Sequence, residues 1–144
     1  MSLLSNIQKA VNFFGKSKGY ERLLDGVKVL SAEPGKVKFQ LEVKEEHLNN
    51  AGTLHGGMIC SLVDSVSTYA IATTKENKFG VSVDLNVSFI SAAFLGEKVI
   101  IESEVLRTGK NLAYANTNIL KEDGKLVATG RHTKYLNFGN QVKM

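Results

Sequence analysis

Residues 57–74, GMICSLVDSVSTYAIATT, decide the fold of this chain. The segment predicts one long helix whose apolar side chains cover more than one face, namely Met58, Ile59, Leu62, Val63, Val66, Tyr69, Ala70 and Ile71. A helix that is apolar on several faces is surrounded by protein rather than resting on a surface. Asp64 is the only formal charge between His47 and Lys75, yet the glycines, asparagines and hydroxyls of this stretch are too polar for a membrane span. We therefore expect a helix buried inside a protein domain.

Strands are predicted on both sides of this helix. Residues 36–44 alternate apolar and polar side chains, which is typical of a strand with one buried face. A strand over residues 27–33 precedes it across the Pro34-Gly35 turn, and four more strands are expected at residues 81–89, 97–107, 111–121 and 125–137. The short connections between the late strands favour antiparallel pairing. The predicted fold class is α+β, with a curled antiparallel sheet of about six strands wrapped around the long central helix; a flat sheet with the helix on one face is the alternative.

The N-terminal segment predicts a second helix. Residues 1–20 contain no acid and place Leu3, Leu4, Ile7, Val11 and Phe14 at helical spacing, which indicates an amphipathic helix packed on the domain. A mitochondrial targeting segment is the alternative, although such segments are Arg-rich and this one has no Arg. Because 144 residues suffice for one domain, we expect a single domain over residues 21–138 and a short tail over residues 139–144.

Charge and cysteine content narrow the partners and the compartment. The chain has 18 Lys and Arg against 14 Asp and Glu, a net charge of +4, and three of the 18 are Arg. This excess of positive charge is small and comes mostly from Lys. It fits binding of an anionic small ligand better than binding of nucleic acid. Cys60 is the single cysteine, so no disulfide forms within the chain and a reducing compartment is expected. The sequence shows no secretion signal, so we expect a cytoplasmic protein and leave mitochondrial association open.

The densest cluster of unusual residues runs from Asn49 to Gly57 (NNAGTLHGG) and is followed by Asp64. Together with Leu62-Val63-Asp64, residues 80–86, Leu95-Gly96-Glu97 and residues 130–134, it resembles the hotdog-fold acyl-CoA thioesterases of the phenylacetate-thioesterase type. The similarity covers about residues 20–136. It implies the hotdog fold and hydrolysis of acyl-CoA to a free acid and CoA. The implied acyl group is a medium or long fatty chain, and aryl-acetyl thioesters are the rival substrates.

Gly56 and Asp64 are the two principal candidates for the chemistry. Thioester hydrolysis needs a donor to the developing oxyanion and a nucleophile or base. The resemblance assigns the first role to the Gly56 N–H, at the start of the helix, and the second to Asp64, as nucleophile or general base. Eight residues of helix separate them by about 12 Å along the axis. Either the substrate runs the length of the helix, or the site combines two subunits of a two-fold dimer. The resemblance implies the dimer, and a homotetramer built from two of them.

Three further residues are expected to assist Gly56 and Asp64, namely Asn49, Ser82 and His55. The resemblance implies that Asn49 positions the thioester or the lytic water, and that Ser82 bonds the Asp64 carboxylate or its water. Ser82 lies on a strand face that is otherwise polar. His55, beside the glycines, is placed near the site in a supporting role. We expect no metal, because the histidines are widely spaced and Cys60 has no partner, and no cofactor, since coenzyme A is part of the substrate.

Coenzyme A carries phosphates, so its docking surface should be basic. A turn with two cations meets this need, formed by Arg107, Thr108, Gly109, Lys110, Asn111 and Leu112. The resemblance adds Asp84, Tyr135 and the segment Phe89, Ile90, Ser91, Ala92, Ala93 and Phe94, with charge nearby from Arg131 and Lys134. Relatives usually carry Pro, and often Lys, in the loop occupied here by residues 91–94. Ala92 and Phe94 therefore remove rigidity and a cation from this loop.

Two other functions compete with hydrolysis. A hotdog hydratase or dehydratase uses a His–carboxylate pair on the acyl chain, whereas His55 here adjoins the glycines. A non-catalytic acyl-CoA binding or scaffold protein would act through a lipid-transfer protein partner. The presence of Asn49, Gly56, Asp64 and Ser82 together favours the enzyme.

Overall fold

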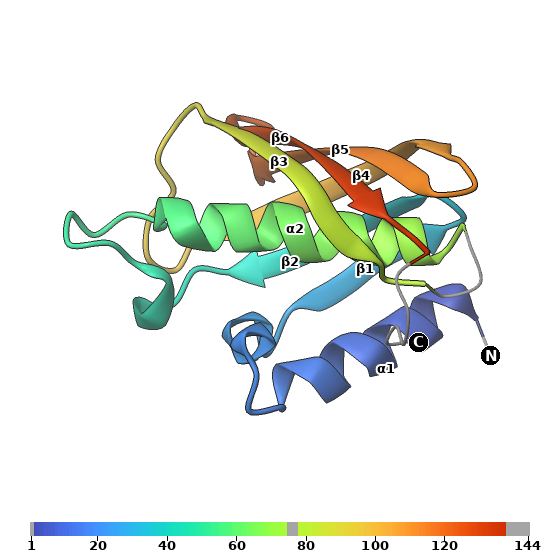
Figure 1. Ribbon diagram of the computed structural model, residues 1–144. Helices are drawn as coiled ribbons and strands as arrows, with labels where there is room; N and C mark the ends of the chain where they lie inside the picture. Colours follow the sequence, from blue (N-terminus) through green and yellow to red (C-terminus); the bar gives the residue numbers. More distant parts are fainter. Residues whose placement is uncertain (1, 75–77, 138–144) are drawn as a thin grey trace.

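The computed structural model describes residues 2–74 and 78–137, and Figure 1 shows how its elements are arranged. Two α-helices, α1 (Leu3–Gly15) and α2 (Gly56–Ala72), are joined to six strands and two short 3₁₀ helices, η1 (Tyr20–Leu24) and η2 (Glu45–His47). The strands are β1 (Lys28–Glu33), β2 (Lys36–Glu42), β3 (Val81–Phe89), β4 (Lys98–Thr108), β5 (Leu112–Lys121) and β6 (Leu126–Tyr135). Each expected strand is present, with ends within a few residues of those predicted.

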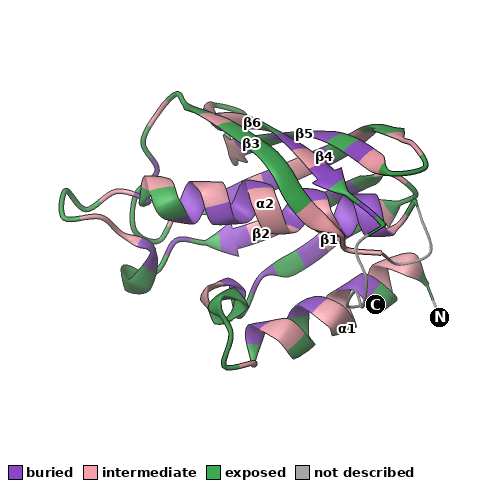
Figure 2. Cartoon of the chain, in the orientation of Figure 1, coloured by how far each residue is buried: buried purple, intermediate pink, exposed green. Residues whose placement is uncertain are grey.

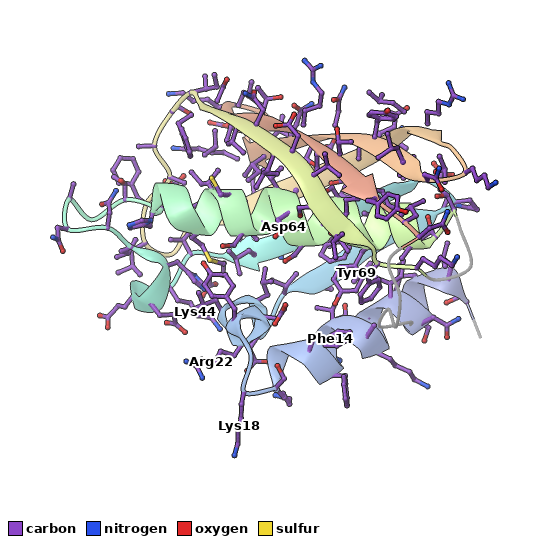
Figure 3. The ribbon with its side chains drawn as sticks, viewed as in Figure 1. Phe14, Lys18, Arg22, Lys44, Asp64 and Tyr69 are labelled. Atoms are coloured by element: carbon purple, nitrogen blue, oxygen red, sulfur yellow. The ribbon has the colours of Figure 1, made fainter. Side chains whose placement is uncertain are left out.

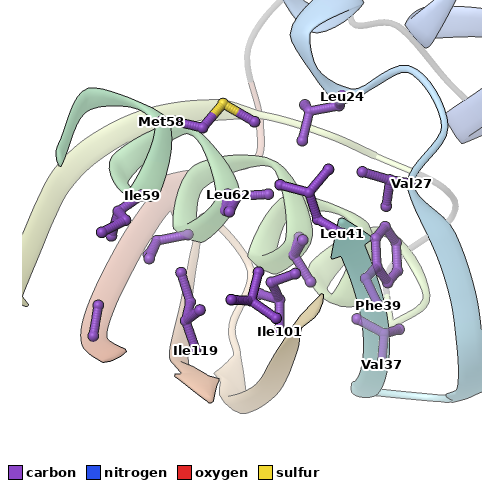
Figure 4. Packing of buried hydrophobic residues seen from close by; sticks show 14 of the residues in the cluster. Leu24, Val27, Val37, Phe39, Leu41, Met58, Ile59, Leu62, Ile101 and Ile119 are labelled. Carbon is purple, nitrogen blue, oxygen red and sulfur yellow. The ribbon is translucent and has the colours of Figure 1, made fainter. Parts of the chain in front are cut away.

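The six strands form one antiparallel sheet in the order β1-β2-β4-β5-β6-β3. The sheet curls around α2, which confirms the predicted fold class (Figure 1). Buried side chains of α2, including Met58, Ile59 and Leu62, pack against those of β2, β4 and β5 (Figure 4). The alternation over residues 36–44 is also confirmed, because Val37, Phe39, Leu41 and Val43 are all buried. Burying one helix on several sides therefore explains its broad apolar surface.

The N-terminal helix is shorter than expected. α1 begins after Ser2, whose side chain caps the N–H of Ser5, and it ends at Gly15 rather than near residue 20. Its buried residues Ile7 and Val11 join the main core, as predicted. The tail expected at residues 139–144 lies outside the described residues. No helix in the described part of the chain is long and apolar enough to cross a membrane.

One edge of the sheet is covered by α1. Gln8 of α1 accepts a hydrogen bond from the Val29 N–H at 2.7 Å and donates to the Val27 carbonyl at 3.1 Å. The Val29 N–H belongs to the edge strand β1, and the Val27 carbonyl lies just before it. The Gln8 amide therefore forms hydrogen bonds with backbone groups at this edge, as a further strand would.

The other edge strand, β3, is open to solvent. In the described part of the chain it pairs with β6 alone. Its apolar residues Val83 and Phe89 are 60% and 56% exposed, and Figure 2 shows the strand mostly exposed beside a mostly buried α2. A long apolar edge strand of this kind is a template for pairing with another chain.

A β-bulge in β3 changes the face on which Ser82 lies. Ser82 pairs with Lys134 of β6, whereas Asp84 pairs with Thr133, so one extra residue lies between two successive pairs. Directly paired residues share a face. Ser82 therefore faces α2 together with Lys134, while Asp84 lies on the opposite face. The expectation that Ser82 shares a face with the polar residues that follow it is wrong.

Candidate active site

The loop before α2 leaves backbone N–H donors available at the helix start. His55 is the N-cap of α2, and its Nδ1 accepts the Gly57 N–H at 2.7 Å. Within residues 2–74 and 78–137 no acceptor is found for the N–H of Gly56, the first residue of the helix. Unpaired N–H groups at a helix start attract negative charge. This geometry suits an oxyanion, and it places the His55 ring at the cap of the helix, next to the Gly56 N–H.

Asn49 holds the loop together. Its Oδ1 accepts the N–H groups of Ala51 and Thr53, both at 3.0 Å, and its Nδ2 donates to the Thr53 hydroxyl at 2.8 Å. The side chain thus shapes the turn that leads into α2.

Asp64 lies midway along α2 (Figure 3), and its side chain is 48% exposed. Its Oδ1 is 3.8 Å from Nε2 of His132 and 3.5 Å from the hydroxyl of Thr68. A half-exposed carboxylate on an otherwise apolar helix can reach a ligand while remaining anchored to the protein.

His132 is the site residue that the sequence analysis missed. It is fully buried on β6, and its ring bonds two hydroxyls at 2.7 Å, Nδ1 to Ser67 of α2 and Nε2 to Ser82 of β3. Burial lowers the pKa of His132 to about 4, with Asp64 and Asp84 acting in the opposite sense and Lys134 in the same sense. The imidazole is therefore neutral at neutral pH. The only signal in the sequence is its place in the 130–134 block.

Ser82 is near Asp64 but is bonded to His132 rather than to the carboxylate. Lys134, which the sequence analysis placed among charges near the coenzyme, is instead 5% exposed and donates from Nζ to the Thr68 hydroxyl at 2.7 Å. It points toward α2 and is not a surface cation. Arg131 remains exposed on the same strand.

The segment after β3 lies beside the helix start. A Cβ built on Gly56 would lie 3.3 Å from the Phe89 ring, so that exposed ring flanks the glycine. The Ala93 carbonyl accepts the Leu54 N–H at 2.8 Å. Ala93 is buried and can offer a ligand only its backbone, whereas Ile90, Ala92 and Phe94 are exposed and Ser91 is half-buried. Lys121 lies beside this loop, with its Nζ 5.2 Å from the centre of the Phe94 ring and 3.3 Å from Oε1 of Glu97.

The basic turn lies at the other end of α2. The hydroxyl of Thr108 is 2.7 Å from that of Thr74, which follows the last turn of the helix. Leu112 of β5 and Val81 of β3 both pair with Tyr135 of β6, so these residues share this end of the sheet. Arg107, Lys110 and Asn111 are exposed, and Gly109 and Leu112 are half-buried.

The expected site residues therefore fall into two groups. Asn49, His55, Gly56 and the 89–94 segment gather at the N-terminal end of α2. The second group contains Ser82, Asp84, the 107–112 turn and Tyr135, and Asp64 faces it from the middle of the helix. α2 has 17 residues, which at 1.5 Å each separate its ends by about 25 Å. One subunit does not bring the two groups to one carbonyl.

The described residues contain no group of three or more His, Cys, Asp or Glu side chains that could hold a metal ion. His47, for example, is buried, and its two ring nitrogens bond the Lys44 N–H and the Leu23 carbonyl.

Sequence and structure comparisons agree on the family. Residues 51–128 match the family model described as the thioesterase superfamily. Acyl-coenzyme A thioesterase 13 of Homo sapiens is 43% identical over 136 residues, covering 94% of this chain and 97% of the relative. The crystal structure of zebra fish thioesterase superfamily member 2 superposes with a TM-score of 0.92 at 43% identity, covering 95% of this chain and 100% of that one. The Mus musculus structure gives 0.88 at 40% identity, with 95% and 99% covered.

Proposed function

Because this chain belongs to the thioesterase superfamily, we propose that it hydrolyses acyl-CoA thioesters to a free acid and CoA, in active sites shared by two subunits. The observation that carries the proposal is the separation of the Gly56 group from the Asp64 group along α2. Each group holds half of what thioester hydrolysis needs, namely an oxyanion donor in one and a carboxylate in the other.

A two-fold dimer through β3 would join the halves. The free edge of β3 can pair with the same edge of a second copy, which covers its exposed apolar side chains. Antiparallel pairing about an axis near the middle of β3 would set the Phe89 end of one subunit against the Val81 end of the other. Gly56 of one subunit and Asp64 of its partner would then flank one thioester. The larger assembly we propose is a homotetramer, a dimer of such dimers.

Asp64 is the group that handles water. As a general base, its carboxylate takes a proton from water while the water oxygen bonds to the carbonyl carbon and the carbonyl oxygen becomes an oxyanion. Collapse of that intermediate breaks the C–S bond, and the CoA thiolate takes up the proton that Asp64 holds. As a nucleophile, Asp64 would itself displace the thiolate, and water would cleave the resulting anhydride. In either route we propose that the Ser82 hydroxyl, which is bonded to Nε2 of His132, orients the water.

The site residues also suggest how the substrate lies. The exposed cations of the 107–112 turn suit the coenzyme phosphates. The exposed apolar side chains of Ile90 and Phe94, which lie beyond the end of β3, suit a fatty acyl chain of medium or long length. No further cofactor is needed for this chemistry. We propose that the protein is cytoplasmic. Association with mitochondria and binding of a lipid-transfer protein are further elements of this proposal.

Thiol release from CoA thioesters tests the proposal. The panel comprises short, medium and long fatty acyl groups and phenylacetyl-CoA, with Asp64→Asn and Asp64→Ala compared with the parent. We expect the parent to release thiol and both variants to lose at least about a hundredfold in kcat, the order of a missing catalytic acid or base. Asp123→Asn, at an exposed turn, is the matched control and should keep the parental rate. Tight acyl-CoA binding without thiol release would favour the scaffold function instead.

A further inference from the structure

The buried ammonium of Lys134 has no part in the function proposed above. Its Nζ donates to the Thr68 hydroxyl at 2.7 Å, and Thr68 in turn lies 3.5 Å from Oδ1 of Asp64 and donates to the Asp64 carbonyl at 2.7 Å. A buried charge is costly unless another group compensates it. Among the described residues, the compensating charge close by is the Asp64 carboxylate, reached across one hydroxyl.

A second basic group competes for the same carboxylate. His132 lies two residues before Lys134 on the same face of β6, and its Nε2 is 3.8 Å from Oδ1 of Asp64. If the ring gained a proton, both nitrogens would become donors and the imidazolium would form an ion pair with Asp64. That pair would remove the carboxylate from the ligand and would reverse the bond between Nε2 and Ser82, whose hydroxyl would then accept a hydrogen bond instead of donating one.

We propose that Lys134 is a positioning residue of the Asp64 site: its ammonium, anchored by Thr68, acts together with burial to exclude a second positive charge from His132 and so leaves the Asp64 carboxylate open to the ligand. Like charges in a poorly hydrated space repel strongly, so one cation there suppresses another. The role in hydrolysis rests on the proposed function, whereas the effect on His132 does not.

The charged and titratable groups around His132 are few. Asp64 faces it from α2, Asp84 acts from β3, and Lys134 acts from its own strand. Burial and Lys134 lower the pKa of His132, and the two carboxylates raise it. The hydroxyls of Ser67, Thr68 and Ser82 complete the polar surroundings. Burial also lowers the pKa of Lys134 to about 8, with Asp64 opposing the shift, so Lys134 remains mostly charged at neutral pH.

The test is an NMR titration of the His132 ring in the parent and in Lys134→Met, Lys134→Arg and Thr68→Val. In the parent we expect a midpoint near the value of about 4. Lys134→Met removes the charge but keeps an apolar chain, so its midpoint should rise, while burial, the larger cause of the lowered pKa, holds it below the ordinary value of 6.5. Lys134→Arg keeps the charge and should keep a low midpoint. Thr68→Val, which frees the ammonium to move away, should lie between them.

Hydrolysis measured on the same variants completes the test. If Lys134→Met raises the midpoint, its kcat should begin to fall at a correspondingly higher pH than that of the parent, with KM much less affected, and Lys134→Arg should restore the parental profile. An unchanged His132 midpoint in Lys134→Met overturns the inference, even if the variant is less stable. Absence of thiol release in the parent refutes the proposed function but leaves the titration to decide the role of Lys134. Should Lys134→Met not fold, the His132 midpoint in Thr68→Val is compared with that in the parent and in Lys134→Arg. A midpoint in Thr68→Val that is no higher than in these two overturns the inference.

Discussion

The Ser82 hydroxyl and Nε2 of His132 lie 2.7 Å apart, although 50 residues separate them in the chain. The pairing of β3 with β6 brings the two strands together, and the bulge after Ser82 turns its side chain toward the ring. His132 thereby connects β3 to α2, because its other nitrogen bonds Ser67. A fully buried imidazole at such a junction makes stability depend on its charge.

Acid should destabilise the fold through His132. Its pKa is about 4 in the folded protein against 6.5 ordinarily, so the unfolded chain binds a proton between these values that the folded chain does not. The free energy of unfolding should therefore fall as pH drops from 6.5 to 4, by an amount on the order of 3 kcal/mol. Urea titrations at several pH values measure it. His132→Gln should show a shallower slope over this window, and an equal slope would refute this origin of the acid sensitivity.

Gly130 and Gly56 should respond differently to alanine. A Cβ on Gly130 would lie 2.8 Å from Cγ1 of Val63 and 3.1 Å from the Asn86 carbonyl oxygen, so Gly130→Ala overpacks the contact between β6 and α2. We expect it to cost about 1–3 kcal/mol of unfolding free energy. A Cβ on Gly56 meets only the exposed Phe89 ring, which can move. Gly56→Ala should leave Tm nearly unchanged, and similar losses in both variants would contradict this account.

Two inactive variants should recover activity when mixed. Gly56→Pro removes the proposed oxyanion donor, and proline is tolerated at the first position of a helix. The extended backbone of His55, with φ −63° and ψ 136°, suits a residue before proline. In heterodimers with Asp64→Ala, one of two shared sites is intact, so an equal mixture should regain about a quarter of the parental rate. If heterodimers form, verified by tagged copurification, and remain inactive, the sites are not shared.

The basic turn should matter only for the coenzyme. Arg107→Ala with Lys110→Ala should raise KM for CoA thioesters by about three- to tenfold at low salt, since exposed charge contacts contribute up to about 1 kcal/mol each. The effect should shrink as salt screens the phosphates. The double variant should leave KM unchanged for pantetheine thioesters, which lack the nucleotide. The control Lys125→Ala, at the opposite hairpin, should leave KM for CoA thioesters unchanged. An equal rise in KM for both thioesters would place the coenzyme elsewhere.

Patterns local to the chain were sufficient for the architecture. The many-sided apolar surface of residues 57–74 favoured a surrounding sheet over a flat one, and the alternation over residues 36–44 favoured a strand. The resemblance offered Gly56 and Asp64 as candidate site residues, and the constant rise of a helix predicted the distance between them.

Tertiary structure decided the surroundings of those residues. A single extra residue in β3 reverses the face of Ser82, and no sequence period reveals where a bulge falls. His132 and Lys134 alternate with Arg131 and Thr133 as an ordinary strand does. Their burial beside Asp64 follows from strand pairing between segments about 50 residues apart. The sequence by itself determined the helix and the sheet and offered Gly56 and Asp64 as candidate site residues; the fold alone decided that a buried histidine and lysine face the Asp64 carboxylate, because burial and long-range pairing are properties of the packed molecule.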